Sequence, residues 1–376
     1  MDLGARREGL IGLLSKARRL TSIMIDLSIY SLAFGDKLAA LEALAIEDEV
    51  DEIVRDAVAL MSLAVRSPSQ EGLAKGIVEL AAAFDRASDA AGDMAQLALR
   101  GYPPHRYVTA SAICCGEVVA ALKSERSSEP LEAVDVVLVR RGGRSILSPE
   151  DMPILRGDVV IVRGALEAVY EAAEILGARP PRLESSVDAM LADETARGFA
   201  RAKVLARAGY DASLYSLLAG DEVLARTILE MEEIMDLEIT GLMEALTAQG
   251  AGRPGEVLAG YTFLSGLEDL SDAAARVAGV VVGGLAGEVL GMTVEDPWES
   301  YLQLEYSSPE PADLEELGLD EEGIVVVAAR VGGRWVIPFV ENPVLEKGDT
   351  VLAKIYAGQA GALKRFLESK GFTVRG

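Results

Sequence analysis

Four pairs of acidic residues, each spaced four residues apart, are the side chains of this sequence best suited to chemistry. A spacing of four places two carboxylates one above the other on the same face of a helix. The pairs are Glu47 with Asp51, Asp85 with Asp89, Glu232 with Asp236, and Glu268 with Asp272. Where two pairs face each other, four carboxylates converge on an oxygen-only site for Mg²⁺, Ca²⁺, Mn²⁺ or iron. The sequence therefore predicts divalent metal or iron at these eight residues.

The same pairs also fit the solvated surface of an acidic protein. The chain carries 60 acidic and 36 basic side chains, a net charge of −24. Surface charge of one sign keeps a protein soluble without any ligand. Recurrence of the pairs in both halves of the chain favours a common role, and both interpretations stay open here.

The negative net charge argues against some classes of binding partner. Phosphate binding needs a basic face, so this charge argues against nucleic acid and against anionic lipid. No uncharged stretch is longer than residues 277–287, which are too few to span a bilayer. The N-terminal residues lack a signal peptide's apolar core, so we expect a cytoplasmic protein, peripheral to the membrane where it binds a transporter.

The basic residues are mostly arginine. Arg outnumbers Lys 27 to 9, which fits a thermophile and equally a GC-rich genome.

The residues that most often catalyse are scarce. His105 is the single histidine and follows Pro104 in a predicted link, so we expect a surface or linker residue rather than a general base. Cys114 and Cys115 are the two cysteines, and we expect two buried, reduced thiols. No phosphate loop or nucleophile elbow occurs, and no Gly-x-Gly-x-x-Gly follows a predicted strand. A metal-dependent hydrolase needs an open coordination position and a general base, and the sequence identifies neither, so we expect no enzyme.

The two halves of the chain are related by duplication. Residues 28–36 (SIYSLAFGD) recur as residues 213–221 (SLYSLLAGD), an offset of 185. Residues 85–91 recur as residues 268–274 at an offset of 183. Later, residues 140–144 and 155–158 recur as residues 330–334 and 346–349. Matches in the same order over roughly 130 residues indicate common ancestry of the halves.

Each half begins with a pattern of three helices. Gly35-Asp36 and Gly220-Asp221 pair a helix C-cap with the N-cap of the next helix. Breaks at 67–69 (SPS) and 250–255 (GAGRPG) separate the second helix from the third. Three helices of about 25–30 residues joined by short loops predict an antiparallel bundle.

Each bundle is followed by a segment with strand patterns. The predicted strands are residues 134–139, 145–147 and 159–162 in the first half, and 324–329, 335–337 and 350–353 in the second. A helix closes each half, at residues 165–176 and 359–369. We therefore predict an α+β multidomain protein in which a three-helix bundle and a small α+β domain form a unit duplicated in tandem. The predicted domains are residues 1–106, 107–180, 181–292 and 293–376.

The acidic motifs resemble those of the PhoU family, which is associated with the regulation of phosphate uptake. Residues 84–89 (FDRASD) and 267–272 (LEDLSD) are similar to that family's Leu-Glu-Arg-Ile-Gly-Asp signature on its third helix. Members of the family can bind metal clusters through these carboxylates. The resemblance thus implies a metal site at the acidic pairs.

The small domains resemble the TrkA C-terminal domain, also called RCK_C, a regulatory domain of potassium transporters and channels. The similarity covers residues 140–158 and 330–349, with Arg, a Gly-Gly turn, a Pro and a Gly-Asp turn. Such domains pair, and some of them hold a small ligand at the pair interface, including cyclic di-AMP in certain bacterial members. The resemblance implies ligand-binding positions at Arg140, Arg144, Ser148, Pro149, Arg330, Arg334, Ile337 and Pro338. The alternation of the two domain types is similar to archaeal proteins that join them.

These resemblances imply two functions. In the leading hypothesis the protein is a non-enzymatic cytoplasmic regulator of an ion transporter or channel, with potassium as the expected ion, and senses a small ligand or ion through its paired RCK_C-like domains. In the alternative it is a metal-binding PhoU-like adaptor in phosphate-uptake signalling. The expected partners are a membrane transporter or channel subunit and a small ligand, with pairing in a homo-oligomer or within one chain.

Overall fold

The computed structural model describes residues 3–64, 70–149, 152–179, 192–249, 253–338, 342–356 and 360–375. The contacts divide the chain into two compact units, and each unit draws on both halves of the sequence. The helical unit comprises Met1–Thr109 and Leu205–Asp296, and the sheet unit comprises Ala110–Val204 and Pro297–Gly376. The predicted breaks at 67–69 and 250–252, the helix start at 359 and the domain boundary at 180 lie outside the described residues.

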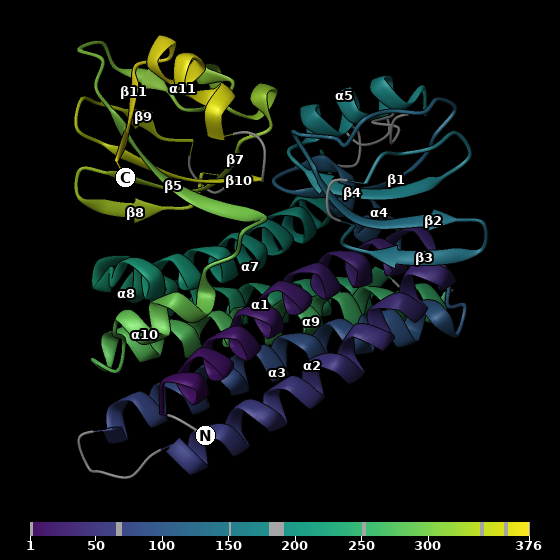
Figure 1. Cartoon of the computed structure of the whole chain (residues 1–376). Helices are drawn as coiled ribbons and strands as arrows, with labels where there is room; N and C mark the ends of the chain where they lie inside the picture. The colour runs from purple at the N-terminus through teal and green to yellow at the C-terminus, as the bar shows by residue number, and fades with distance from the viewer. Residues whose placement is uncertain are drawn as a thin grey trace. The chain divides into compact units, whose positions relative to one another are not determined.

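The helical unit is built from the two predicted bundles, and all six long helices are confirmed (Figure 1). They are α1 (Leu3–Phe34), α2 (Lys37–Ala64), α3 (Glu71–Leu99), α7 (Glu194–Ala219), α8 (Glu222–Gln249) and α9 (Pro254–Val282). The short α4 (Arg106–Cys114), α10 (Glu288–Gly291) and 3-10 helix η2 (Met292–Val294) complete its connections. No described helix is both long and apolar enough to cross a bilayer.

The repeated Gly-Asp pairs end one helix and begin the next, as predicted. Gly35 and Gly220 adopt φ of 66° and 67°, the left-handed conformation that ends a helix. Oδ1 of Asp36 accepts from the backbone N–H groups of Leu38 and Ala39, both at 3.0 Å. Oδ1 of Asp221 accepts from Leu224 N–H at 2.9 Å. These bonds satisfy N–H groups that a helix leaves unpaired at its N-terminus.

The two bundles pack through their third helices, α3 and α9. Arg276 pairs with Glu79 at 2.7 Å near one end, and Arg86 pairs with Asp269 at 2.8 Å further along. Residue numbers rise on α3 as they fall on α9, so the helices run antiparallel. Arg86 and Asp269 are 183 residues apart, the repeat offset, so each is the other's counterpart in the duplication. The halves therefore contact each other through the same face.

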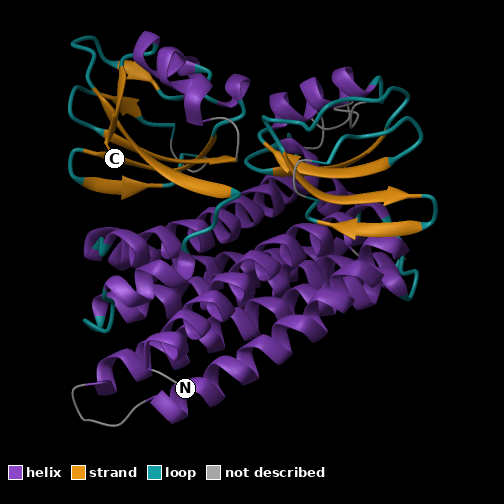
Figure 2. Ribbon diagram, viewed as in Figure 1, coloured by secondary structure: helices purple, strands orange, loops and turns teal. Residues whose placement is uncertain are grey.

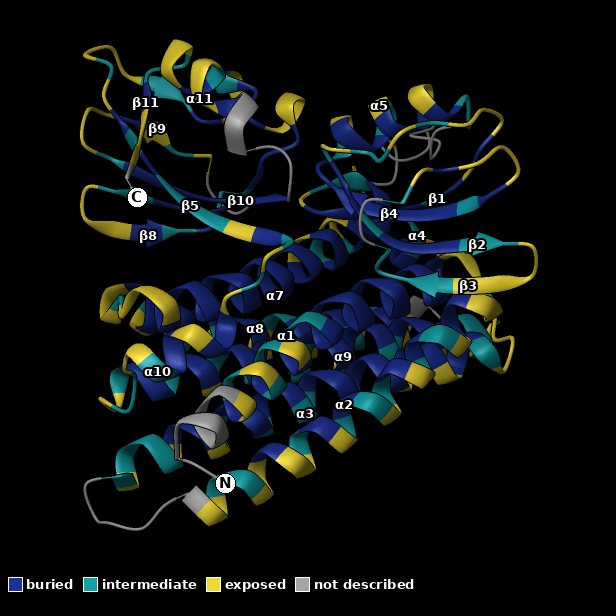
Figure 3. Ribbon diagram, in the orientation of Figure 1, coloured by how far each residue is buried: buried dark blue, intermediate teal, exposed yellow. Residues whose placement is uncertain are grey.

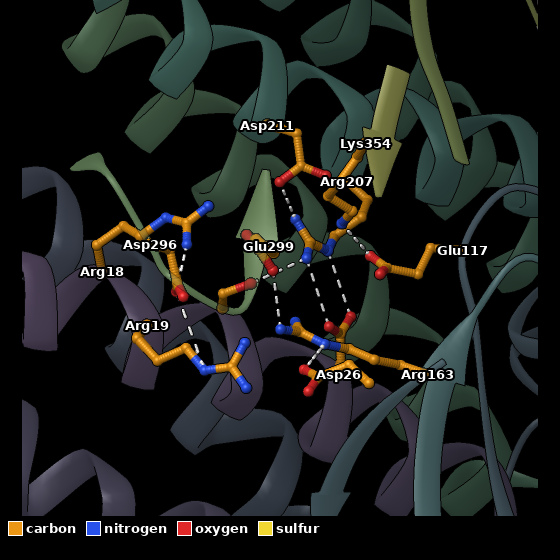
Figure 4. A network of polar contacts seen from close by, with 12 residues as sticks. Arg18, Arg19, Asp26, Glu117, Arg163, Arg207, Asp211, Asp296, Glu299 and Lys354 are labelled. Carbon is orange, nitrogen blue, oxygen red and sulfur yellow. Dashed lines mark hydrogen bonds and ion pairs between the residues drawn. The ribbon is translucent and has the colours of Figure 1, made fainter. Parts of the chain in front are cut away.

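A buried ionic group lies between α1 and α7. Arg207 contacts Asp26 at 3.3 Å and Asp211 at 2.7 Å, and it donates to Ser22 Oγ at 3.0 Å (Figure 4). Arg207 and Ser22 are counterparts, 185 residues apart. All four side chains are buried, so the carboxylates offset the cost of desolvating the guanidinium.

The sheet unit contains two small α+β modules, and every predicted strand and helix of both is present (Figure 2). The first module has the antiparallel order β1-β4-β2-β3 and the second β11-β5-β10-β7-β8. The strands of the first sheet are β1 (Val118–Lys123), β2 (Asp135–Arg141), β3 (Arg144–Leu147) and β4 (Val159–Gly164), followed by α5 (Leu166–Leu176). Those of the second are β5 (Glu299–Tyr306), β7 (Val325–Val331), β8 (Arg334–Val336), β10 (Thr350–Tyr356) and β11 (Phe372–Arg375), with α11 (Ala360–Ser369) before β11. The sequence prediction missed β1, β5, β11 and the short pair β6 (Ala312–Asp313) and β9 (Val344–Leu345).

The repeated motifs of the modules have structural roles. Gly142, Gly143 and their counterparts Gly332 and Gly333 all have positive φ, as a tight two-residue hairpin requires. Asp158 of the Gly-Asp turn accepts from Arg141 Nη2 at 2.7 Å and from Leu155 N–H at 2.8 Å. These bonds lower the pKa of Asp158, with the Arg141 hydrogen bond as the largest cause. Its counterpart Asp349 accepts the equivalent bond from Glu346 N–H, and it accepts from Gly332 N–H in place of an arginine.

The modules are joined by a reciprocal pair of buried ion pairs (Figure 4). Arg163 of β4 donates to Glu299 of β5 at 2.9 Å, and also pairs with Asp135 within its own module. Lys354 of β10 contacts Glu117, just before β1, at 2.7 Å. Arg163 and Lys354 occupy equivalent strand positions, so each module supplies one cation and one carboxylate to the other. These cations are fully buried.

Two sequence predictions about single residues need correction. His105 lies in the link between α3 and α4 as predicted, but its side chain is 9% exposed rather than at the surface, and its Nδ1 accepts from Tyr107 N–H at 3.3 Å. Burial lowers the pKa of this imidazole. Cys114 and Cys115 at the end of α4 are half-buried rather than buried, and their sulfur atoms lie next to each other.

The buried pairs make a stability prediction. Lys354→Met takes away the cation that lies 2.7 Å from the buried Glu117 carboxylate, and we expect a loss of about 3 kcal/mol in the free energy of unfolding. Adding Glu117→Leu also removes the buried carboxylate and restores most of that loss. Urea unfolding measures both, with Lys364→Met on an exposed position of α11 as the control. A Lys354→Met variant as stable as this control contradicts the prediction.

Candidate metal centres

The eight predicted carboxylates lie on the second and third helices of each bundle. Burial explains their positions, because core side chains occupy the neighbouring helical stripe (Figure 3). On α8, Ile228, Met231, Met235 and Ile239 are buried at helical spacing. Glu232 and Asp236 each follow one of these buried residues, so they lie at the edge of the core. The carboxylates are consequently half-buried or exposed rather than deeply enclosed.

The second bundle brings three predicted ligands together. Glu232 and Asp236 of α8 and Asp272 of α9 offer oxygens that all lie within 4.8 Å of one another. We call these three residues the second cluster. Glu268 lies beside it, since the charge of Asp236 is the main cause, after burial, that raises the pKa of Glu268. Burial also raises the pKa of Glu232, followed by the charge of Asp236.

The first bundle arranges its four predicted ligands differently. Glu47 of α2 lies against α3 at Gly92, where a Cβ atom would collide with the Glu47 carboxylate. The residue at the counterpart of Gly92 is Ala275. The first cluster, defined as Glu47, Asp51, Asp85 and Asp89, thus has one carboxylate that reaches closer to the helix backbone.

The position of Glu47 against α3 affects the pKa of its carboxyl group. Burial, followed by the negative charges of Asp89 and Asp51, raises the pKa of Glu47 from its ordinary 4.5 to about 7. Burial also raises the pKa values of Asp85 and Asp89, and the charge of Asp269 from the second half contributes at Asp89. The cluster therefore concentrates negative charge that a proton or a cation would relieve.

The chemistry available at these clusters is cation binding. Carboxylate oxygens are hard ligands suited to Mg²⁺, Ca²⁺ and Mn²⁺, and to iron with additional oxygen ligands. The second cluster meets the first requirement of such a centre, because three oxygens from two helices can approach one ion. The ligand assignments for all eight residues stay predictions.

The predicted small-ligand residues fall into two groups. Arg140, Arg144, Arg330 and Arg334 lie on the β2–β3 and β7–β8 hairpins, and Arg144 and Arg334 are exposed. Arg330 donates to its own hairpin at the Gly333 carbonyl. In the first module Ser148 has a positive φ of 42° and donates its N–H to Val137, next to Pro149. In the second module, Ile337 and Pro338 line a cavity.

This cavity has a volume of about 470 Å³ and lies within the sheet unit. Its walls combine apolar side chains, among them Leu319 and Val326, with the polar Glu315 and Asn342. Cys114 and Cys115 also line it. The sequence prediction did not find this cavity, because its walls come from segments far apart in the chain.

A pH effect follows from the raised pKa of Glu47. The group binds its proton more tightly in the folded state, so its contribution is full below pH 4.5 and is lost as the pH rises through about 7. Glu47→Gln imitates the protonated form, and we expect the metal-free variant to exceed the wild type in stability by about 1 kcal/mol at pH 8 and to match it at pH 5. Thermal unfolding with a chelator present measures this difference. The exposed Glu52→Gln on the same helix is the control, and equal pH profiles for wild type and Glu47→Gln would contradict the assignment.

Comparisons with known proteins show a distant likeness to a solved structure. No protein-family model matches the chain, and no curated protein matches it. Among solved structures, the chain is similar to PhoU from Pseudomonas aeruginosa, with 14% identity and a TM-score of 0.43. The match covers 75% of this chain and 97% of that one. The likeness is too distant to assign a family, and the resemblance of the small modules to TrkA C-terminal domains stays a prediction.

Proposed function

We propose that this protein is a non-enzymatic adaptor whose helical unit binds a divalent cation at its carboxylate clusters. The observation that carries the proposal is the convergence of Glu232, Asp236 and Asp272 within 4.8 Å. Positions on two different helices supply the oxygens, so a bound cation would join α8 to α9. The counterpart residues of the first half form a second acidic group, as expected for a site that predates the duplication.

The donor set fits a hard divalent cation. All three ligands are carboxylates, and the described part of the helical unit places no sulfur ligand in the group. Burial, followed by the negative charge of Asp236, raises the pKa of both Glu232 and Glu268. A bound cation would offset this negative charge and act as a structural or sensory ion.

The acidic motifs further favour a role like that of PhoU-family proteins. Residues 84–89 and 267–272 carry the signature on α3 and α9, the helices through which the halves pack. On this basis we assign the protein to signalling around phosphate uptake, with a membrane transporter or its associated proteins as partner. Metal occupancy would be the signal that the adaptor transmits.

A second function is favoured by the cavity in the sheet unit. Its lining by Ile337 and Pro338 agrees with a small-ligand sensor that regulates an ion transporter, potassium being the expected ion. A ligand regulates only where it binds one arrangement of the modules better than another. The two functions are compatible, since they use different units of the chain.

Metal binding is tested directly with Mn²⁺, which prefers oxygen ligands. We expect the purified protein to bind Mn²⁺ and Asp272→Asn to weaken binding at the second cluster at least about tenfold, because one of three charged ligands is lost. Electron paramagnetic resonance of free Mn²⁺ measures occupancy. The matched control is Glu244→Gln, on an exposed turn of α8 outside the cluster. A wild-type protein that binds no Mn²⁺ rules out the proposal.

The sensor function is tested by calorimetric titration with K⁺, cyclic di-AMP and ATP. We expect one of these probes to bind and Val326→Trp to abolish binding by filling the cavity. Val136 is the counterpart of Val326 in the first module and does not line the cavity, so Val136→Trp serves as the control. Absence of binding by all three probes counts against the sensor function.

A further inference from the structure

An arginine from the first half reaches the carboxylate cluster of the second half. Arg86 of α3 donates through Nε and Nη2 to Oδ1 of Asp269 on α9, at 3.1 and 2.8 Å. The same Nη2 forms an ion pair with Oδ2 of Asp272. Asp272 is the α9 member of the second cluster, together with Glu232 and Asp236. A cation of the protein itself therefore already contacts an oxygen of the candidate metal centre.

The duplication prevents the same arrangement at the first cluster. Arg86 has Asp269 as its counterpart, so the position that supplies a guanidinium to the second cluster supplies a carboxylate in the other half. Asp269 is near enough to Asp89 for its charge to act there. Arg86 thus partly neutralises the second cluster, whereas Asp269 adds negative charge near the first cluster.

The Arg86 guanidinium lies near solvent, where it can separate from Asp272. The side chains of Arg86, Asp269 and Asp272 are 41%, 36% and 24% exposed. Charge pairs at such exposure contribute little net stability, because water solvates the separated groups well. Asp269 can also retain Arg86 after Asp272 has lost it. Release of Asp272 therefore needs neither unfolding nor a buried, unpaired charge.

We propose that Arg86 is a built-in competitor for the metal ligand Asp272, so that a divalent cation occupies the second cluster only as the guanidinium leaves it. This inference rests on the proposed metal-binding function and adds a form of regulation to it. Arg86 joins α3 to α9, so the cation that displaces it also removes an ion pair between the two halves. Metal occupancy and the contact between the halves are then linked, and the linkage acts in both directions.

The competition is measured with Mn²⁺ in an Asp89→Asn background, which disables the first cluster. Adding Arg86→Gln removes the competitor, and we expect Mn²⁺ to bind about fivefold more tightly, the factor that a half-exposed charge pair can contribute. Arg86→Lys keeps a competing cation and restores most of the weaker binding. Further addition of Asp236→Asn abolishes the gain, which places it at the second cluster.

A matched control separates competition from a general change in charge. Arg276 of α9 also forms an inter-helix ion pair with α3, to Glu79, with side chains 40% and 43% exposed. Arg276→Gln in the same background removes one positive charge from the same helix pair without touching a carboxylate of the second cluster. We expect its Mn²⁺ affinity to change less than about twofold.

The ion pair itself gives a readout that does not depend on Mn²⁺ affinity. A double-mutant cycle of Arg86→Gln and Asp272→Asn, followed by thermal unfolding of the metal-free protein, measures the coupling between the two side chains. We expect a favourable coupling, and its absence contradicts the contact between Arg86 and Asp272. Equal Mn²⁺ affinity with and without Arg86, or an Arg276→Gln gain as large as that of Arg86→Gln, overturns the inference and leaves metal binding intact. Failure of the wild type to bind Mn²⁺ overturns both.

Discussion

Packing of two copies of one unit through the same faces is the constraint on which this structure depends. In such a contact, a residue near the twofold axis meets its own copy. Identical charged residues would then repel each other at close range. A fused duplication escapes this restriction because the copies can diverge. Arg86 against Asp269 and Arg207 against Ser22 are both pairs of counterparts in contact, and in each pair the two side chains are now complementary.

The two modules of the sheet unit also pack as copies of each other, but their ion pairs join residues that are not counterparts. Arg163 and Lys354 occupy equivalent positions, and each reaches a carboxylate of the other module. Because these charges are buried, the cation of each module needs the carboxylate of the other module to offset the cost of its desolvation. Pairing is therefore part of the folded state of the modules. The additional partner of Arg163, Asp135, has an apolar counterpart in Val325, so the two ion pairs have diverged in strength as well as in chemistry.

Much of the fold could be predicted from the sequence because its signals are local. Glycine and aspartate at 35–36 and 220–221 mark helix ends through backbone conformation and capping, and both act as predicted. The Gly-Gly turns likewise specify hairpins. The strands β1 and β5 were missed because nothing beside them in sequence marks them. Each is the neighbour of a central strand, β4 or β10, that lies about 40 to 50 residues further along the chain, beyond the reach of local signals.

At the candidate site, too, features set by neighbouring residues could be predicted, and features set by packing between helices could not. Spacing of four residues correctly places Glu232 and Asp236 on one face of α8, but the approach of Asp272 depends on how α9 packs. The depth of Glu47 depends on a missing side chain at Gly92, which no acidic motif signals. Arg86 was visible only as part of a family-like motif, because its role comes from the opposite half. Duplication thus supplies two similar acidic motifs, and the contact between the halves then makes them different. A chain with two inequivalent clusters can respond to a cation over a wider range of concentrations than one with two identical sites, since each cluster fills at its own concentration.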